Sequence, residues 1–399
     1  MEEVMKTSKF IEELDKRGLL LDHTVDLESL HEHFADAKNG VSFYIGFDPT
    51  ADSLHVGSLQ QLIIMDLAKK FGHNPIVLLG GATASIGDPS FKDSMRPIMN
   101  TETIIHNTSK LKEQVNTMIP SIDIVNNLGW TQNLNLLDFL RDFGKHFSVN
   151  KMLASSAVKD RLEREDCGLT VLEFSYSLLQ GLDFLKLNEK LDVTVQMGGS
   201  DQKFNILQGI DLVHKVKGKK VIGITNPLVL KSDGTKMGKT ASGAVWLDKT
   251  KTSVFDFFQF WRNIDDQETV ELSKRFLGLV IKPTDDINHA KHNLAMKMVE
   301  FVHGTDEKTI LENELTSGKA STKIITSRDN VITLIDLLFV SNVFTSKSEI
   351  RRMVSNKENL SVNGKKIIFE EQLKKHIDSE TNEFFIEKGK KTKVTVLLT

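Results

Sequence analysis

Hydrophobic residues near the amino end follow first a helical and then a strand pattern. Apolar positions recur with helical spacing over residues 9–21 and 59–71. Two short runs rich in β-branched and aromatic residues, 41–47 and 75–79, predict buried strands. The order strand, loop, helix, strand predicts a right-handed parallel α/β unit, and such units bind ligands beyond the carboxyl ends of their strands.

The pattern beyond this unit predicts mainly helices and then a return to strands. In chain order, we expect helices over residues 101–118, 134–144 and 171–187 and strands over 193–197 and 221–230. A polar loop follows over 231–240, and then a helical region over 253–303. Residues 305–330 are rich in Thr, Ser, Lys and Glu, which predicts a linker or a loosely packed segment.

The tail, residues 331–399, differs from the rest of the chain in charge. It carries a net charge of +3, against −6 for the remainder. The run 346–349 has the spacing of a capping box that begins a helix, and Asn363-Gly364 between two apolar runs predicts a hairpin with a two-residue turn. We therefore expect a small, independent α+β module at this end.

The overall composition is that of an ordinary globular protein and excludes several classes. With 399 residues, 40% of them hydrophobic and 26% charged, the chain is long enough for two or three domains. Its single cysteine, Cys167, excludes an internal disulfide and a multi-thiolate zinc site, and favours a reducing compartment. The amino end carries acidic residues at once, and no run approaches the ~18 apolar residues of a membrane span. We therefore expect a cytoplasmic protein.

Residues 44–58 form the first segment with candidate chemistry. A strand there leads into the start of a helix, where unpaired backbone N–H groups and the helix dipole favour an anion. His55 can donate to a phosphate oxygen, and Gly57 leaves room for a nucleotide against the backbone. A loop histidine beside a capping serine is the alternative interpretation.

The polar loop 231–240 is the second such segment. Lys236 and Lys239 lie three residues apart among glycines, so they can neutralise a polyphosphate and follow its charge during a reaction. A solvated basic loop is the alternative interpretation.

Tyrosine is so rare that each one is a candidate for a hydroxyl with a role. The chain has 23 Phe but only two Tyr, Tyr44 and Tyr176. Tyr176, Gln180 and Asp183 share one face of a predicted helix. Such a face is usually solvated, but the leucines around it favour a pocket.

In this order, the two segments resemble the His-Ile-Gly-His and Lys-Met-Ser-Lys-Ser signatures of class I aminoacyl-tRNA synthetases. Further matches narrow the resemblance to the bacterial-type tyrosyl-tRNA synthetases. They are Gly80-Gly81-Ala82-Thr83, Gly87-Asp88-Pro89-Ser90, residues 141–150, Glu173-Phe174-Ser175-Tyr176 with Leu179-Gln180 and Asp183, and residues 196–202. The resemblance covers roughly residues 5–305 and, more weakly, the tail.

The resemblance implies an α/β fold in three parts. These are a Rossmann-like parallel-sheet catalytic domain with a helical insertion (1–243), a helical tRNA-binding domain with a linker (244–328) and an S4-like RNA-binding domain (329–399). Family members are homodimers in which one tRNA spans both subunits. The partners implied are therefore L-tyrosine, ATP, tRNA(Tyr) and a second copy of the chain, with no membrane.

The resemblance also implies a role for each matching residue. For tyrosine, Tyr44 and Asp183 would bind the phenol, Tyr176, Asp88 and Gln180 the ammonium, and Gln202 the carboxylate, with Gln196 in the same pocket. For ATP, the binding residues would be Asp201 and Gly199 at the ribose, with Asp48 beside them, Gly57 and Lys239. The catalytic set would be His55, Thr50, Lys236, Lys239 and Thr240, joined by Lys92 and Arg96 from a second loop. In the tail, Arg351, Arg352, Lys365 and Lys366 are candidate RNA contacts.

The implied reaction has two steps. The tyrosine carboxylate attacks the α-phosphate of ATP in line, without a covalent enzyme intermediate, and gives tyrosyl-adenylate and pyrophosphate. Tyrosine is then transferred to the 3′ end of its tRNA. ATP is a substrate that brings Mg²⁺ with it, and we expect neither a prosthetic group nor a metal site made by the protein.

The sequence departs from the family pattern in places. Ser58 stands where the signature has its second His, the lysine loop reads Lys-Met-Gly-Lys-Thr, and Lys203-Phe204 replaces a common Trp-Gly.

Two alternative functions stay open. The Tyr44 and Asp183 pair argues against a tryptophanyl-tRNA synthetase, and the signature His and lysines argue against an inactive RNA-binding or splicing factor derived from a synthetase.

Overall fold

The computed structural model describes residues 6–88, 99–153, 170–240, 243–318, 320–378, 381–389 and 392–399. The described chain divides into two compact units, one of residues up to 247 together with 264–291, and one of 248–263 together with 292–399. Among the described residues, no helix has both the length and the apolar character needed to cross a bilayer. The predicted division at 243 and 328 stays a prediction.

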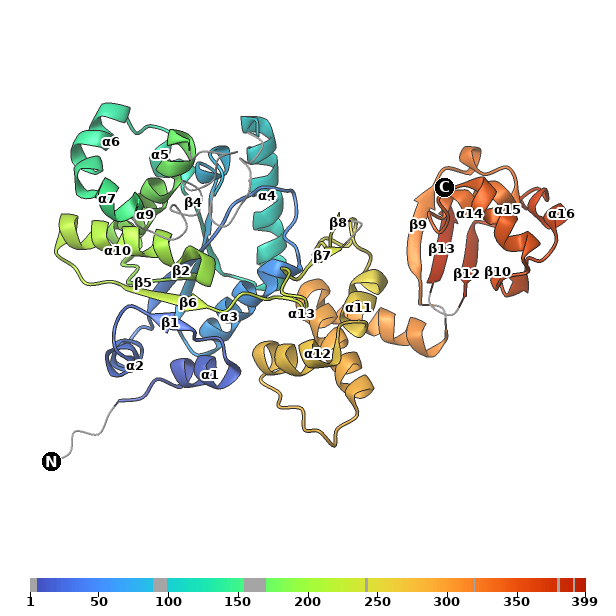
Figure 1. Ribbon diagram of the computed structural model, residues 1–399, viewed down its shortest axis with the longest axis horizontal. Helices are drawn as coiled ribbons and strands as arrows, with labels where there is room; N and C mark the ends of the chain where they lie inside the picture. Colours follow the sequence, from blue (N-terminus) through green and yellow to red (C-terminus); the bar gives the residue numbers. More distant parts are fainter. Residues whose placement is uncertain are drawn as a thin grey trace. The chain divides into compact units, whose positions relative to one another are not determined.

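A mainly parallel sheet organises the first unit (Figure 1). Its strands are β1 (Asp22–His23), β2 (Ser42–Phe47), β3 (Asn74–Leu79), β4 (Asp123–Asn126), β5 (Val195–Gly199) and β6 (Ile222–Asn226). Within the described residues their order is β1-β6-β5-β2-β3-β4, with β1 antiparallel to β6 and the other pairs parallel. The fold is therefore mixed α/β with a parallel-strand sheet, as the pattern predicts.

Helices connect these strands and flank the sheet. They are α1 (Lys9–Arg17), α2 (Leu27–Ala35), α3 (Leu59–Lys70), α4 (Thr101–Met118), α5 (Leu128–Thr131), α6 (Leu136–Asp142), α7 (Val149–Leu153), α9 (Val171–Leu191) and α10 (Lys203–Lys217). Helix α12 (Asp266–Leu272) follows later in the same unit. Short 3-10 turns η1 (Val56–Ser58), η2 (Thr83–Ser85), η3 (Gly144–His146) and η4 (Ser200–Gln202), a hairpin of β7 (Lys239–Thr240) and β8 (Gly243–Ala244), and the π-helical turn η5 (Ser273–Leu277) complete the unit. Strands β3 and β5 are almost wholly buried, which is typical of a parallel sheet covered on both faces.

The strand order places a crevice at the carboxyl ends of β2 and β5. From β2 the chain proceeds to β3 and β4 on one side, whereas β5 and β6 extend the sheet on the other. Loops that leave β2 and β5 in opposite directions open a space between them, and ligands bind there in open α/β sheets. Asp48 follows β2, and Ser200 to Gln202 follow β5.

The second unit contains α11 (Val254–Arg262), most of α13 (Ile287–Thr316) and the tail. The tail folds as an α+β module, in which α14 (Leu334–Val340), α15 (Lys347–Ser355) and α16 (Glu370–Leu373) pack with a five-stranded sheet of the described residues, ordered β11-β10-β12-β13-β9 (Figure 1). Its strands are β9 (Thr322–Thr326), β10 (Leu360–Val362), β11 (Lys365–Lys366), β12 (Glu383–Lys388) and β13 (Thr392–Leu398), with a 3-10 turn η6 (Arg328–Asn330). The predicted hairpin at Asn363-Gly364 is confirmed, with φ of 48° and 74° at these two residues.

The prediction of a linker over 305–330 is wrong. Helix α13 continues to Thr316, and β9 pairs in parallel with β13. Thr322 and Thr326 lie on the same face of this edge strand as Ile324, and Ile325 on the other face is exposed. The strand therefore lacks the apolar run that predicts a buried strand, although its backbone is paired.

Other differences concern the bounds of elements. Helix α1 ends at Arg17 rather than at 21, because Gly18 adopts a left-handed conformation (φ 71°) and caps it. Strand β6 ends at Asn226, four residues before the predicted end. Strand β4 was not predicted, because it is short and only half-buried and lies in a stretch that is otherwise helical.

Candidate active site

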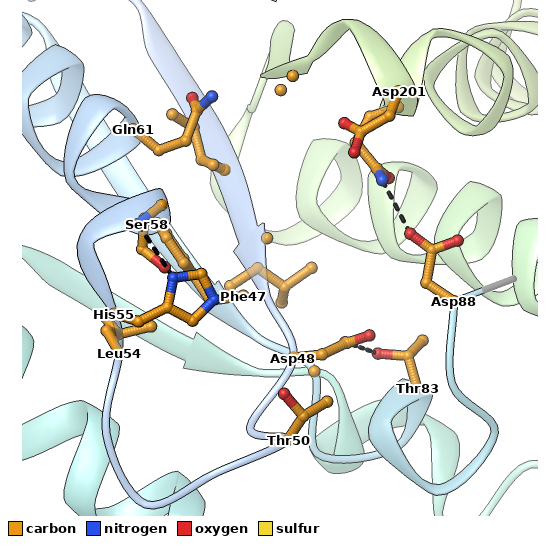
Figure 2. Close-up of a pocket in the computed structure, with 18 of the residues that line it drawn as sticks. Phe47, Asp48, Thr50, Leu54, His55, Ser58, Gln61, Thr83, Asp88 and Asp201 are labelled. Atoms are coloured by element: carbon orange, nitrogen blue, oxygen red, sulfur yellow. Dashed lines mark hydrogen bonds between the residues drawn. The ribbon is translucent and has the colours of Figure 1, made fainter. Parts of the chain in front are cut away.

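One cavity of about 690 Å³ lies at the carboxyl ends of the strands. Figure 2 shows His55, Ser58 and Gln61 on one side of it and Asp88 and Asp201 on the other. Its lining includes these predicted residues: Tyr44, Asp48, Thr50, His55, Gly57, Asp88, Tyr176, Gln180, Asp183, Gln196, Gly199, Asp201, Gln202 and Lys236. Residues from both signature segments therefore meet in one cavity.

Asp183 is held at one end of the cavity by two donors. It lies on α9 and is almost fully buried. Asn127 Nδ2 donates to its Oδ2 at 3.0 Å, and Trp130 Nε1 donates to its Oδ1 at 2.9 Å. Burial raises the pKa of this carboxyl to about 7, with a smaller contribution from the negative charge of Asp48, although the two hydrogen bonds oppose the rise.

Tyr44 lies at the same end of the cavity. It comes from β2, its ring contacts Phe184 edge to face at 5.4 Å, and its hydroxyl is buried without a hydrogen-bond partner in the described structure. Burial, and then the nearby charge of Asp183, raises the pKa of this phenol. A buried hydroxyl and a buried carboxylate thus face the cavity together, and both can still bond to a ligand.

Tyr176 and the acidic groups form the next layer of the site. The Tyr176 hydroxyl donates to Asp48 Oδ2 at 2.9 Å, and Thr83 Oγ1 donates to Asp48 Oδ1 at 2.7 Å. Burial raises the pKa of Tyr176, and Asp48 and Asp88 add to the rise. The backbone of Gly80 packs closely against the Asp48 carboxylate. A Cβ on Gly80 would lie 2.0 Å from Asp48 Oδ1, so glycine leaves the room that this arrangement needs.

Gln202 connects two other predicted residues. Its Nε2 donates to Asp88 Oδ2 at 2.8 Å, and its Oε1 accepts from Gln180 Nε2 at 3.4 Å and from Asn205 Nδ2 at 3.1 Å. The predicted helical face is confirmed, since Tyr176, Gln180 and Asp183 all project from α9 into the cavity.

The opposite end of the cavity lies at the start of α3. His55 Nδ1 accepts from the backbone N–H of Gly57 at 3.0 Å. When the ring is neutral, its proton is therefore on Nε2. The prediction of unpaired amides at this helix start is wrong for the first turn, because the N–H groups of Gly57, Ser58 and Leu59 are already paired within η1. Side chains must supply most of the positive charge here.

Lys236 brings positive charge from the lysine loop to the lining of the cavity. Its Nζ forms an ion pair with Asp201 Oδ2 at 2.9 Å. The structure describes the backbone of Lys239 and Thr240, which form β7. Lys92 and Arg96 lie outside the described residues. No group of three or more His, Cys, Asp or Glu side chains suited to a metal ion occurs in the described part of the chain.

The candidate RNA contacts all lie in the second unit. Arg351 and Arg352 are exposed on α15, and Arg351 lies 3.8 Å from Glu370. Lys365 and Lys366 are exposed in β11. The residues that line the cavity all belong to the first unit.

Comparison with known proteins gives a consistent picture. The model of the class I tRNA synthetases of the W and Y type matches residues 36–320. Tyrosine–tRNA ligases of Clostridium kluyveri and Pelagibacter ubique are 43% and 42% identical, covering 89% and 90% of this chain and 91% and 92% of theirs. The chain belongs to the tyrosine–tRNA ligase family of class I synthetases.

A solved structure supports the same assignment. The C-terminally truncated mitochondrial tyrosyl-tRNA synthetase of Aspergillus nidulans superimposes with a TM-score of 0.66 at 30% identity, over 77% of this chain and 93% of its own. The chain is thus an aminoacyl-tRNA synthetase, and of the two alternatives left open the relatives do not favour the tryptophanyl one.

The sequence pattern did not predict four residues of the site. Asn127 and Trp130 follow the unpredicted strand β4, so nothing pointed to their place beside Asp183. Trp246 lines the cavity after the lysine loop. Gln61 also lines it, and its Oε1 is buried without a hydrogen-bond partner among the described residues. Its spacing of three from Ser58, at the start of α3, was a signal that could have identified it.

Proposed function

We propose that the chain activates L-tyrosine with ATP in this cavity and transfers it to the 3′ end of tRNA(Tyr). The single observation that supports this best is the composition of the cavity. Its lining presents the hydroxyl of Tyr44 and the carboxylate of Asp183, and it also presents the imidazole of His55 and the ammonium of Lys236. A phenolic amino acid matches the first pair of groups, and a triphosphate matches the second.

The part of the cavity that contains Tyr44 and Asp183 favours tyrosine over phenylalanine and tryptophan. A phenol hydroxyl both donates and accepts, so it can donate to Asp183 and accept from Tyr44. Phenylalanine would leave the Tyr44 hydroxyl unpaired and would offer no donor to Asp183, and an indole N–H, which only donates, would leave the Tyr44 hydroxyl unpaired. Asn127 and Trp130 leave Asp183 further lone pairs for the ligand.

The middle of the cavity suits the rest of the amino acid. Asp88 and Gln180, with the oxygen of Tyr176, offer acceptors for an ammonium. Gln202 is already oriented by its bonds to Asp88 and Asn205, and it faces the space where the carboxylate would lie. Gln196 lies in the same lining, and its Oε1 is buried without a hydrogen-bond partner in the part of the chain that the structure describes.

The far end supports the chemical step. One carboxylate oxygen of tyrosine attacks the α-phosphorus, and the bond to the bridging oxygen of the β-phosphate breaks as pyrophosphate leaves. His55 and Thr50 would contact the phosphates, and Lys236, Lys239 and Thr240, with Lys92 and Arg96, would stabilise the charge of the leaving pyrophosphate. Asp201 and Gly199, beside Asp48 and near Gly57, would hold the ribose. ATP would enter as its Mg²⁺ complex.

The second unit would bind the tRNA. We propose a helical tRNA-binding domain over 244–328 and an S4-like domain over 329–399, to whose sheet β9 adds an edge strand. Both follow a Rossmann-like catalytic domain over 1–243. Arg351, Arg352, Lys365 and Lys366 offer exposed cations for phosphates of the RNA. This reaction belongs in the cytoplasm, where tRNA is charged.

A homodimer is the assembly that we propose. Large apolar side chains are exposed close together in sequence on α6, α7 and the start of α9, namely Leu136, Leu137, Leu140, Val149, Leu153 and Val171. Contiguous exposed apolar side chains mark protein interfaces, and a second copy of the chain would cover them.

The test is tyrosine-dependent ATP–pyrophosphate exchange. Wild type, Lys239→Ala and Asp183→Ala are compared, with tryptophan as the competing amino acid. We expect exchange with tyrosine alone, a loss of at least about 100-fold in kcat for Lys239→Ala, and a raised tyrosine KM for Asp183→Ala. Wild-type activity of Lys239→Ala would contradict the role of the lysine loop, and RNA binding without exchange would favour an inactive RNA-binding protein.

A further inference from the structure

The segment after the lysine loop pairs with the segment that carries His55. Trp246 and His55 face each other in an antiparallel bridge. Beside it, the N–H of Val56 donates to Val245 O at 3.0 Å, and the N–H of Leu247 donates to Leu54 O at 2.9 Å. The two segments thus form one short ribbon, although they are far apart in the sequence.

This ribbon also connects back to the lysine loop. The N–H of Val245 donates to Gly238 O at 2.8 Å, next to the β7–β8 hairpin. Gly238 has a φ of 89°, and a Cβ built on it would lie 3.1 Å from the backbone nitrogen of Gly57. The backbones of the two signature segments are therefore in close contact.

Trp246 occupies the face of the ribbon that is directed at the cavity. Its neighbours Val245 and Leu247 are both buried in the core, whereas Trp246 is half-buried and lines the cavity. Side chains alternate between faces along a strand, so this position is not needed for the core beneath. The indole instead contacts the imidazole of His55, with ring centroids 6.4 Å apart at an interplanar angle of 67°.

We propose that Trp246 is a positioning residue for His55. The imidazole is restrained on Nδ1 by the N–H of Gly57, and a Cβ at Gly57 would lie 2.7 Å from its Cε1. The edge-to-face contact with Trp246 then restricts the remaining freedom of the ring. Nε2–H is thereby held toward the phosphates of ATP, while the ribbon keeps His55 beside the lysine loop. This inference rests on the proposed role of His55.

The test is a double-mutant cycle on the exchange reaction. We expect Trp246→Ala to lower kcat about tenfold with the tyrosine KM unchanged, since a displaced catalytic group costs rate rather than amino-acid binding. Trp246→Phe, which keeps an aromatic edge, should retain kcat within about threefold. In a His55→Ala background, Trp246→Ala should lower kcat less than about twofold further.

Val245→Ala is the matched control on the other face of the ribbon. It should lower the melting temperature, and any effect on kcat should multiply with that of His55→Ala. If Trp246→Ala does not fold, Trp246→Leu takes its place in the cycle. If the double variant loses as much kcat as the product of the losses for Trp246→Ala and His55→Ala, the proposal is overturned. Wild-type activity of His55→Ala would overturn the role of His55 itself and this inference with it, whereas exchange with tyrosine would still stand.

Discussion

The hydroxyl of Tyr44 is buried and has no hydrogen-bond partner in the described structure, whereas that of Tyr176 donates to Asp48. The same substitution should therefore act in opposite directions at these two residues. An unpaired buried hydroxyl destabilises the free protein, and it becomes useful only when a ligand bonds to it.

We expect Tyr44→Phe to leave the free energy of unfolding unchanged or to raise it by up to about 1 kcal/mol. It should also raise the tyrosine KM about tenfold, which is the loss of about 1.4 kcal/mol of binding. Tyr176→Phe, the matched control, should lower the free energy of unfolding by about 1–3 kcal/mol. Chemical denaturation and exchange kinetics measure both, and a clear destabilisation by Tyr44→Phe would refute the assignment.

The pKa of Asp183 predicts a pH dependence of tyrosine binding. Its folded-state value of about 7 lies above the ordinary value of 3.8, so between these values the unfolded chain loses the proton first. The free energy of unfolding therefore falls as the pH rises through this window, and it stops falling above about pH 7. The phenol of tyrosine donates best to the ionised carboxylate, so affinity should rise with pH up to about 7.

Binding of tyrosine measured by calorimetry between about pH 5.5 and 8.5 tests this. Below about pH 7 we expect the affinity of wild type to fall close to tenfold per pH unit. Asp183→Asn should bind more weakly than wild type at pH 8, lose this dependence, and unfold at a higher denaturant concentration than wild type at that pH. A wild-type affinity that is constant across the range would show that Asp183 does not receive the phenol.

At the scale of elements, the lysine loop offers a matched pair of glycines. Gly234 and Gly238 both have positive φ, 80° and 89°. A Cβ on Gly234 meets nothing within 4 Å, whereas one on Gly238 lies 3.1 Å from Gly57 N and 3.2 Å from Val56 Cβ. Alanine at either site adds the same backbone strain of about 1–2 kcal/mol. Only Gly238→Ala also pushes the two signature segments apart.

We therefore expect Gly238→Ala to lower kcat of the exchange reaction at least about tenfold, and Gly234→Ala to change it less than about threefold. Both variants should lower the melting temperature, and Gly238→Ala at least as much as Gly234→Ala. Equal losses of activity would mean that backbone strain in the loop, rather than the contact with Gly57, is what matters.

At the scale of the whole molecule, strand β9 extends the tail beyond its predicted start. It pairs with β13 along its length, from Thr322 to Thr326, and Ile324 packs against the core of the module. A fragment that begins at 329 would expose β13 as a sheet edge. We expect fragment 320–399 to unfold cooperatively and fragment 329–399 to melt at least about 4–8 °C lower, since this is the shift for each kcal/mol lost. Equal melting temperatures in calorimetry would restore the boundary at 329.

The assembly is tested on the exposed leucines of α6. Leu136 and Leu137 have 69% and 72% of their surface exposed, and Leu21, elsewhere in the first unit, has 56%. Aspartates at 136 and 137 would place charges in the proposed interface. In sedimentation velocity we expect wild type and Leu21→Asp to be dimers and the double variant to be a monomer. A monomeric wild type would refute the homodimer.

Much of the fold could be predicted because it depends on periodicity along the chain. Buried parallel strands require continuous apolar runs, and an amphipathic helix requires a spacing of three and four, so β2, α3, β3 and α4 follow from the pattern. The common helical face of Tyr176, Gln180 and Asp183 follows in the same way. Elements with weak patterns, such as β4 and β9, did not.

What the sequence alone determined were the signature segments, the α/β class and most of the residues that line the cavity. Only the tertiary structure decided which groups restrain them. Asn127 and Trp130 hold Asp183, Thr83 and Tyr176 hold Asp48, and Trp246 contacts His55. These partners are distant in the sequence and are brought together by strand order and by packing. The period of the hydrophobic pattern indicates which face of a helix or strand a residue occupies, but it does not indicate which residues pack against that face.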